Sequence, residues 1–305
     1  MVEKQVYDCI IIGAGPGGLQ AAIYLGRYNR NVLILDRSGG RTRHARHIEN
    51  FLTQKSISGK ELIETGIEQA QNFNVQIQKM PVTKVLKSNY YFEVYTKDDK
   101  FLSKFVIVSS GVYDILPPIE NLHKFLGVSF FTCIDCDGYK TTGKKLVVIG
   151  NSLKTAHLAF AMKEMFTKDI TLIPYHFEIP REYEEELREE NIRLIIGEPI
   201  KITGDEKIEA IEIKTGQLVK CEVIMSNFGY KLNDEFLSAL PLKRDGENFK
   251  FITNTHYESS VNGMYIVGPL NTGKDQAIIA AGEGAVAAID INKRLLEFKL
   301  PIENS

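Results

Sequence analysis

Two cysteines separated by two residues are the first feature of the sequence whose types and spacing could do chemistry. Cys133 and Cys136 lie in the stretch FFTCIDCDGY, and the chain has 4 cysteines in all. This spacing suits half of a zinc site, a structural disulfide or a redox-active dithiol. Zinc needs two further ligands, but Cys9 and Cys221 lie in apolar, strand-like stretches without an adjacent histidine or cysteine, so we predict no metal site.

Length, composition and charge limit the class of protein. The 305 residues suffice for about two domains, and 44% apolar and 25% charged residues are typical of a globular protein. A net charge of −2 gives no electrostatic reason to expect nucleic acid or a membrane as a partner. We find no signal-peptide pattern and no membrane-length apolar run, so we expect a cytoplasmic protein. In that reducing compartment, a Cys-x-x-Cys pair is more often catalytic or metal-binding than structural.

A glycine-rich turn near the N-terminus predicts a dinucleotide site. An apolar strand precedes the turn, a helix-period stretch follows it, and a second strand ends at Asp36, so residues 7–36 form a βαβ unit. Glycines permit a tight turn and the close approach of a pyrophosphate to the helix N-terminus, while the acid can accept from ribose hydroxyls. The turn comprises Gly13, Ala14, Gly15, Pro16, Gly17 and Gly18.

The remaining elements must position the dithiol and this turn. Alternating residues at 75–112 predict an antiparallel insertion that returns to the parallel sheet, and a second βαβ unit begins at 144–150. Turn-rich stretches precede and follow this second unit, and the chain ends in a helical segment that glycines interrupt early. We therefore predict an α/β fold of two Rossmann-like three-layer domains, the second inserted into the first. The boundaries are 1–115 with 245–305 for the first domain and 118–243 for the second.

Several motifs occur in the order found in low-molecular-weight thioredoxin reductases, and the chain resembles that family over nearly its whole length. They are IIGAGPGG, the glycine pair at 39–40, IEN at 48–50, CIDCDG, VVIG at 147–150 and DQAIIAAGEGAVAA at 275–288. The resemblance implies a homodimer with FAD on the discontinuous domain and NADPH on the inserted one. It also implies a thioredoxin-like protein as the electron acceptor.

The resemblance also implies roles for individual residues. Cys136 would face the flavin, Cys133 would attack the protein disulfide, and Asp137 would protonate the departing thiolate, which suits thiolate chemistry. The FAD-binding residues implied are Gly13, Gly15, Pro16, Gly17, Gly18, Asp36, Arg37, Gly39, Gly40, Arg41, Asn50, Gly111, Gly268, Gln276 and Ala277.

The chain departs from the family pattern where NADPH would bind. In the second glycine turn, Ser152 replaces the middle glycine, so a Cβ stands in the way of a pyrophosphate. Pro174, Tyr175 and His176 stand where relatives carry arginines for the 2′-phosphate. Losing two charge-assisted hydrogen bonds costs about 3–6 kcal/mol, or about two to four decades in affinity. We therefore expect NADPH not to be the reductant.

Two further departures lie near the flavin motifs. Pro269 follows Gly268 where relatives have an aspartate that holds the ribityl chain. Five basic residues follow the glycine pair, and they suit a solvated loop, a docking patch for an acidic carrier or phosphate contacts to a second nucleotide. These residues are Arg41, Arg43, His44, Arg46 and His47.

The departures point to the pyridine-nucleotide-independent branches of the family. These are ferredoxin-dependent flavin thioredoxin reductases, deeply rooted thioredoxin reductases and diflavin-linked disulfide oxidoreductases. The electron donor would then be a ferredoxin-like carrier or a second FAD, so we expect one or two FAD per chain. Two alternatives stay open: an NADPH-dependent thioredoxin reductase with an atypical site, and a non-catalytic flavin redox sensor. Residues of a second-dinucleotide site would be Gly150, Asn151, Ser152, Thr155 and Tyr175.

Overall fold

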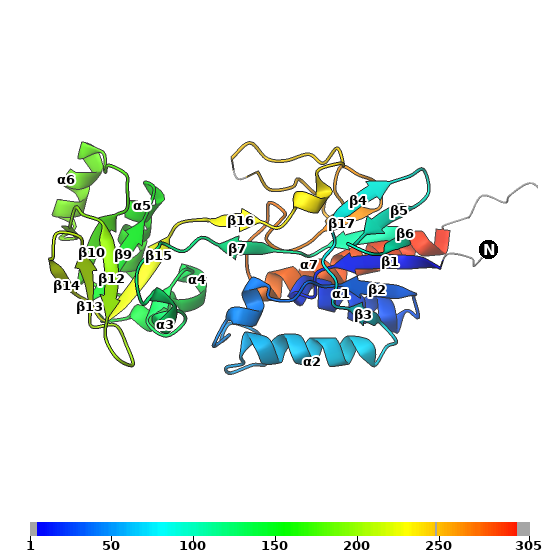
Figure 1. The fold of residues 1–305 in the computed structure, drawn as a ribbon, viewed down its shortest axis with the longest axis horizontal. Helices are drawn as coiled ribbons and strands as arrows, with labels where there is room; N and C mark the ends of the chain where they lie inside the picture. The colour runs from blue at the N-terminus through cyan, green and yellow to red at the C-terminus, as the bar shows by residue number, and fades with distance from the viewer. Residues whose placement is uncertain (1–4, 248, 298–305) are drawn as a thin grey trace, which may run out of the picture. The chain divides into compact units, whose positions relative to one another are not determined.

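The chain divides into two compact units in the computed structural model, which describes residues 5–247 and 249–297 (Figure 1). Unit 1 comprises the described residues up to Tyr113 and from Lys231 on, and unit 2 comprises Asp114–Tyr230. The second crossing between units therefore comes earlier than the predicted boundary at 243/245. The reason is that β16 (Tyr230–Leu232) pairs with β7 (Val112–Asp114), so the chain leaves and re-enters unit 1 in one two-stranded ribbon. Residues 1–4, 248 and 298–305 of the predicted first domain lie outside the described residues.

Unit 1 is built on a mixed sheet of order β3-β2-β1-β6-β5-β4, with β17 also paired to β6. The antiparallel insertion returns to the parallel sheet at β6, as the alternating pattern predicts. The parallel strands are β1 (Val6–Ile12), β2 (Val32–Leu35), β3 (Gln76–Gln78), β6 (Lys100–Val108) and β17 (Met264–Ile266). The antiparallel strands are β4 (Lys84–Lys87) and β5 (Phe92–Tyr95). Apolar runs such as VLIL in β2 suit strands that are covered on both faces.

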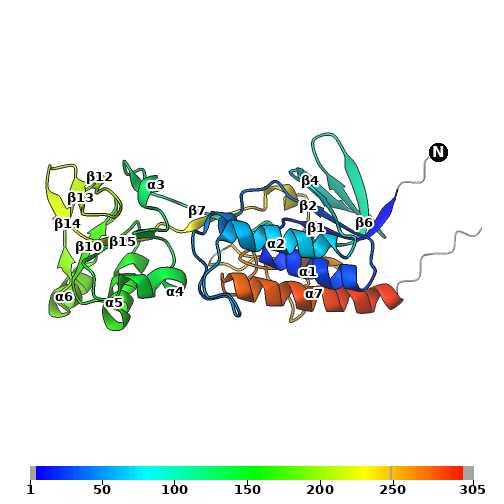
Figure 2. The same cartoon turned by 90° about the horizontal axis from the view of Figure 1, so that it is seen from below.

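Three helices cover one face of this sheet: α1 (Pro16–Arg27), α2 (Gly59–Gln71) and α7 (Ala277–Glu297) (Figure 2). The other face packs against a second apolar cluster that includes Phe92, Leu237 and Phe251. Short turns of 3-10 helix are η1 (Arg41–His44) and η3 (Glu235–Leu237). The predicted interruption of the last helix is wrong, because α7 continues through both of its glycines.

Unit 2 has a parallel sheet of order β11-β10-β9-β15-β8 between two different layers. One layer holds α5 (Lys154–Met165) and α6 (Arg181–Glu189); the other is an antiparallel sheet of β12 (Pro199–Thr203), β13 (Ala210–Ile213) and β14 (Leu218–Lys220). The parallel strands are β8 (Phe130–Phe131), β9 (Leu146–Gly150), β10 (Ile170–Pro174), β11 (Arg193–Leu194) and β15 (Val223–Asn227). The short helices are α3 (Leu122–Phe125), α4 (Ile134–Asp137) and η2 (Gly138–Thr141).

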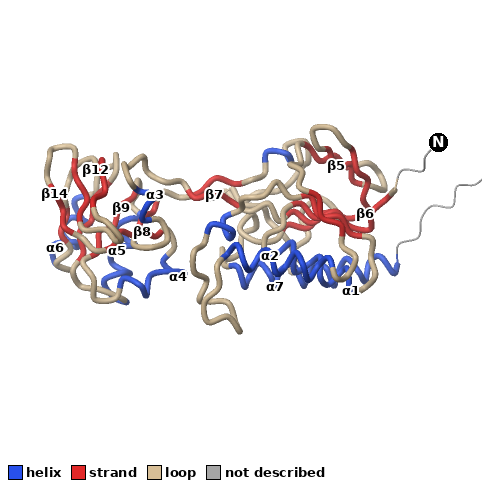
Figure 3. Tube along the Cα trace, turned by 60° about the horizontal axis from the view of Figure 1, so that its bottom comes forward, coloured by secondary structure: helices blue, strands red, loops and turns tan. Residues whose placement is uncertain are grey.

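Both units are three-layered α/β structures, which confirms the predicted fold class (Figure 3). Among the helices that the structure describes, none is long and apolar enough to cross a membrane.

Candidate functional site

The predicted flavin residues of unit 1 gather at the carboxyl edge of its parallel strands. Ile12 of β1 is level with Leu35 of β2 and with Val108 of β6, and Val108 is level with Ile266 of β17. The residues that follow these strand ends therefore meet at one edge, where open α/β sheets bind their ligands. This edge carries Gly13, Asp36, Gly111 and Gly268.

The glycines of the first turn have two different physical roles. Gly13 has φ +102°, and a Cβ there would lie 2.5 Å from the Ser109 carbonyl oxygen; at Gly18 it would lie 2.2 Å from the Gly13 oxygen. Tight backbone packing therefore requires glycine at both positions. Gly40 has no atom within 4 Å of a built Cβ, and Gly15 meets only ordinary contacts beyond 3.7 Å. The missing side chain of Gly15 leaves room for a ligand at the start of α1, and that of Gly40 leaves room at the start of η1.

Asp36 holds the turn around the predicted ribose position. Its Oδ1 accepts from the backbone N–H of Ala14 at 3.0 Å, and its Oδ2 accepts from the N–H of Ser38 at 2.9 Å. Each carboxylate oxygen retains acceptor capacity, so the group can also receive hydrogen bonds from ribose hydroxyls. The neighbouring Arg37 guanidinium lies over the ring of Tyr113, 4.5 Å from its centre.

The fold brings together two predicted residues that are far apart in the sequence. The Asn50 side-chain Nδ2 donates to Oε1 of Gln276 at 3.0 Å, across 226 positions. Ala277, the next residue, begins α7. Gly39 has φ +83°, which favours glycine, and Arg41 starts η1. The contact between Asn50 and Gln276 places the end of the basic loop, residues 41–50, beside the start of the last helix within unit 1.

A buried polar cluster under the start of α7 was missed by sequence reasoning. Glu283 is 3% exposed, and its Oε2 accepts from the Gly268 N–H at 2.5 Å and from Asn271 Nδ2 at 2.8 Å. Lys250, 6% exposed, pairs with Asp275 at 2.7 Å. Burial raises the pKa of the Glu283 carboxyl group. The only available signal was one glutamate within an otherwise small and apolar helical stretch. Pro269 removes the family's aspartate, and this cluster fixes the backbone there.

These features fit FAD. The first turn leaves space at a helix N-terminus for a pyrophosphate, and Asp36 offers acceptors for a ribose. Asn50 and Gln276, which contact each other, come from the loop and the helix start of the same unit.

The dithiol lies in unit 2, where Cys133 and Cys136 form a disulfide. Cys133 is the N-cap of α4, and its sulfur accepts from the Cys136 N–H at 3.1 Å. Asp137 ends α4, and its Oδ1 lies 2.9 Å from Nζ of Lys140, a residue that the sequence patterns did not single out. Both cysteines are partly exposed, so the sulfurs are not sealed in a core.

The other two cysteines have different surroundings. Cys9 and Cys221 are free and buried. Burial raises the pKa of the Cys9 thiol far above its usual range and that of Cys221 to about 12. A thiol of this kind is a poor nucleophile at neutral pH. The dithiol is therefore the reactive sulfur pair among the described residues.

The second glycine turn lies at the carboxyl edge of the unit 2 sheet. Gly150 is level with Pro174 and Asn227, and a Cβ at Gly150 would lie 2.2 Å from Thr155 Oγ1. Ser152 accepts from the Thr155 N–H at 2.9 Å, next to Asn151. Within the described part of the chain, the buried hydroxyls of Thr155 and Ser226 lack a hydrogen-bond partner.

Aromatic rings follow β10 at this edge. The Tyr175 ring meets His176 edge-on at 4.3 Å between centres and Phe228 at 5.4 Å. His176 lies 3.9 Å from the Glu198 carboxylate, whose pKa is lowered by a hydrogen bond from Lys214 at 2.8 Å. The Glu198–Lys214 ion pair and aromatic rings thus stand near the end of β10, and no arginine follows this strand at residues 175–180.

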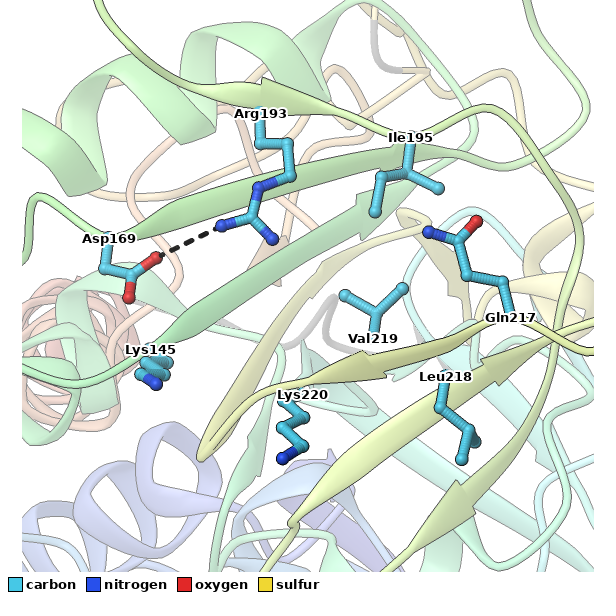
Figure 4. Close-up of a pocket in the computed structure, with 8 residues that line it drawn as sticks. All are labelled: Lys145, Asp169, Arg193, Ile195, Gln217, Leu218, Val219 and Lys220. Atoms are coloured by element: carbon cyan, nitrogen blue, oxygen red, sulfur yellow. Dashed lines mark ion pairs between the residues drawn. The ribbon is translucent and has the colours of Figure 1, made fainter.

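A cavity of about 320 Å³ lies at the opposite, amino edge of this sheet (Figure 4). Figure 4 shows Ile195 and Val219 facing each other across it, with Arg193 turned toward Asp169. Its lining residues come from β11 and β14, from the residues next to these two strands, and from the residues before β9 and β10, so it includes none of the predicted site residues.

The basic loop is partly tied into unit 1. Arg43 pairs with Glu64 on α2 at 3.1 Å, and a ring nitrogen of His44 contacts the Gly39 carbonyl oxygen at 3.2 Å. The His47 ring lies 3.4 Å from the hydroxyl of Ser56. These contacts hold Arg43, His44 and His47 against other parts of unit 1.

Comparisons with known proteins agree with this geometry. The thioredoxin reductase of Bacillus subtilis (strain 168) is 26% identical over 320 residues, which cover 98% of both chains. The NADH dehydrogenase of the same organism is 28% identical. The match covers 94% of this chain but only 58% of that longer protein. The crystal structure of thioredoxin reductase from Streptococcus pyogenes MGAS5005 matches with a TM-score of 0.88 at 25% identity. The match covers 96% of this chain and 99% of the chain in that crystal structure.

The match to a protein family is nearly as long as the chain. Residues 7–284 match the family described as pyridine nucleotide-disulphide oxidoreductase, a span that includes the first glycine turn, the dithiol and the start of α7. FAD binding is expected for this family. The chain therefore belongs to the pyridine nucleotide-disulphide oxidoreductase family, as a thioredoxin reductase-like flavin disulfide oxidoreductase.

Proposed function

We propose that this flavin disulfide oxidoreductase takes electrons from a donor other than NADPH and passes them to a thioredoxin-like protein. The observation that carries the proposal is the carboxyl edge of the unit 2 sheet. There, Tyr175 and His176 follow β10 and an ionised Glu198 stands beside them. A 2′-phosphate at that edge meets a carboxylate that is paired with Lys214, and no arginine stands at residues 175–180, so its binding lacks the charge-assisted hydrogen bonds of a guanidinium.

Bound FAD can hold one or two electrons, so it can join a one-electron carrier to a two-electron disulfide. Two electrons and two protons convert the Cys133–Cys136 disulfide to a dithiol. The Cys133 thiolate then attacks the acceptor disulfide, and Asp137 supplies the proton to the departing acceptor sulfur. Cys136 attacks Cys133, which restores the disulfide and releases the second acceptor thiol. The partly exposed position of both cysteines supports this exchange.

Energetics permit a ferredoxin-like carrier as the donor. Plant-type ferredoxins lie near about −400 mV, and a thioredoxin disulfide lies near about −270 mV. The difference of about 130 mV corresponds to about 6 kcal/mol for two electrons, so the transfer runs downhill. A protein donor needs no dinucleotide pocket in unit 2.

A second FAD in unit 2 is the other non-pyridine donor. The rings of Tyr175 and Phe228 offer flat surfaces, and the unpartnered buried hydroxyls of Thr155 and Ser226 adjoin the second turn, within the described residues. Such a ligand would use Gly150, Asn151 and Ser152 in a pose that differs from the usual dinucleotide.

The competing function is a thioredoxin reductase that uses a pyridine nucleotide at this atypical site. Two relatives, a thioredoxin reductase and an NADH dehydrogenase of Bacillus subtilis, favour it. A flavin redox sensor without turnover is the third candidate, because Pro269 alters the flavin loop.

An anaerobic spectral titration of the purified flavoprotein separates these functions. We expect reduced ferredoxin to bleach the flavin absorbance, and stoichiometric NADPH or NADH to leave it unchanged. Bleaching by stoichiometric NADPH contradicts the proposal. FAD released by acid, counted per chain, distinguishes one flavin from two. After chemical reduction of the flavin, thioredoxin thiols should appear with the wild type but not with C133S. If neither protein produces thioredoxin thiols, the result supports a flavin redox sensor without turnover.

The resemblance also supports a homodimer in the cytoplasm. Exposed apolar side chains form one stripe on α7, and this stripe is the part of unit 1 that we assign to the partner copy. Its residues are Ile278, Ile279, Val286, Ile289 and Leu296. The free thiols of Cys9 and Cys221 suit a reducing compartment.

A further inference from the structure

Lys140 brings a positive charge into the turn that carries the dithiol. Its Nζ lies 2.9 Å from Oδ1 of Asp137, and the two side chains are only 20% and 21% exposed. Ion pairs that are partly shielded from water are screened less by salt than surface pairs. Asp137 directly follows Cys136, so this pair stands in the same turn of the chain as the dithiol.

Packing holds Lys140 in this position. Its Nζ lies 5.8 Å from the ring centre of Phe131 and 5.6 Å from that of Tyr139. A Cβ at Gly138 would come within 2.7 Å of the Phe166 ring, so the turn is packed tightly against the residue that follows α5. The lysine therefore occupies a defined place in the fold instead of sampling solvent.

The charges of the turn oppose thiolate formation unless a cation offsets them. Asp135, which is exposed, and Asp137 both stand within four residues of Cys133, and Tyr139 adds a phenol that is 50% exposed. The neighbours from β8 and from the end of α5 are the uncharged rings of Phe131 and Phe166. Nearby negative charge disfavours a thiolate and nearby positive charge favours it.

We propose that Lys140 is a positioning residue for disulfide exchange, which holds the Asp137 carboxylate and favours the thiolate forms of the dithiol. The proposal rests on the proposed function. In the step concerned, the Cys133 thiolate forms a bond to one acceptor sulfur and the acceptor S–S bond breaks. The electron pair of that bond leaves with the second sulfur, which takes a proton that the Asp137 carboxylate relays from solvent. Without Lys140, fewer thiolates form near neutral pH and the carboxylate loses its anchor.

The test measures alkylation of the reduced dithiol by iodoacetamide from pH 5 to pH 10, because only thiolates react quickly. We expect K140M and K140Q to react about threefold to tenfold more slowly than wild type at pH 7, equal to about half to one unit in the pH midpoint. The rates should converge near pH 10. K140R should follow the wild-type profile, because it keeps the charge.

The matched control is K163M, which removes a half-buried lysine of the same unit that pairs with Glu190 at 3.1 Å. Its alkylation profile should match wild type. Unfolding of any variant is detected by mass spectrometry as alkylation of the buried Cys9 and Cys221. A K140M profile identical to wild type, or slower by one factor at every pH, overturns the proposal.

The alkylation result is independent of the electron donor and the acceptor. If the midpoint shifts as expected but no variant, wild type included, reduces thioredoxin, the proposed function fails while the effect of Lys140 on the dithiol stands. If wild type reduces thioredoxin but K140M and K140R have the same profile, the inference about Lys140 alone fails.

Discussion

Glu283 is a carboxyl group with almost no access to water in the middle of a helix. Its Oε2 receives both hydrogen bonds, one from the Gly268 backbone and one from Asn271, so a single oxygen organises the loop that follows β17. Desolvation penalises the charged form most strongly, and hydrogen bonds to the carboxylate offset only part of that penalty. The residue therefore couples the protonation of one group to the shape of the predicted flavin loop.

We expect E283Q to remove a pH dependence of stability. Burial raises the folded-state pKa of Glu283 above its unfolded value, so the folded chain binds this proton more tightly. The resulting stability is fully present below the usual glutamate pKa and is lost as the pH rises through the folded pKa. Glutamine keeps the oxygen that accepts both hydrogen bonds and has no proton to lose.

Urea unfolding at pH values from 4 to 8 measures this effect. The unfolding free energy of E283Q should increase relative to that of wild type as the pH rises. A gap that stays constant over this range contradicts the assignment. The exposed pair of Lys231 and Glu235 offers a comparison, because E235Q changes a surface glutamate.

The contact between α1 and α7 depends on glycine at the element scale. A Cβ at Gly284 would lie 2.0 Å from the Gly17 carbonyl oxygen, so the two helices touch through their backbones. This close approach explains why a helix-weakening residue stands inside α7 without interrupting it, since tertiary packing outweighs its helix propensity. The same contact fixes the start of α1, where the pyrophosphate is predicted to bind.

G284A should push these helices apart. We expect a loss of about 1–3 kcal/mol in the free energy of unfolding, typical of overpacking, together with faster release of FAD. G282A is the matched control on the same helix, because a Cβ there meets nothing within 4 Å. It should stabilise by about 0.5–1 kcal/mol, since alanine is the better helix former. Equal losses in both variants, from denaturation curves, contradict this account.

At the scale of the whole molecule, one unit is assembled from two distant parts of the chain. β17 completes the sheet that contains β1, the last helix covers one face of it, and the second unit is inserted between these two parts of the chain. α7 therefore has one face in the core and another that presents large apolar side chains to the surroundings. Such a stripe on an α-helix is typical of a surface that a partner covers.

We expect I289E to separate the proposed homodimer. Ile289 is 48% exposed within the stripe, and a charge placed there opposes burial against a second copy. The dimer Kd should rise about a hundredfold, or about 2.7 kcal/mol. Sedimentation over a concentration series measures this, with L218E as the control because Leu218 is exposed on unit 2. A wild type that stays monomeric at all concentrations, or an I289E that dimerises equally, contradicts the proposal.

Local chemistry made much of the protein predictable from sequence. A glycine turn between a strand and a helix, an acid at the next strand end and a Cys-x-x-Cys pair each depend on a few adjacent residues. The βαβ periodicity likewise predicted the three-layered fold of both units. The second domain boundary was misplaced because β16 is a strand of only 3 residues, too short to show a pattern, and its partner β7 lies more than a hundred positions earlier.

Tertiary structure alone decided the features that depend on distant neighbours. Glu283 and Lys250 are polar residues that sequence assigns to the surface, yet folding buries them among backbone groups that they satisfy. Gly284 reads as a helix breaker until Gly17 packs against it. Asp137 was visible from its place after Cys136, but the charge that faces it depends on how η2 turns Lys140 back toward α4. Sequence thus determines which groups can react, and folding determines the charge and packing under which they do so.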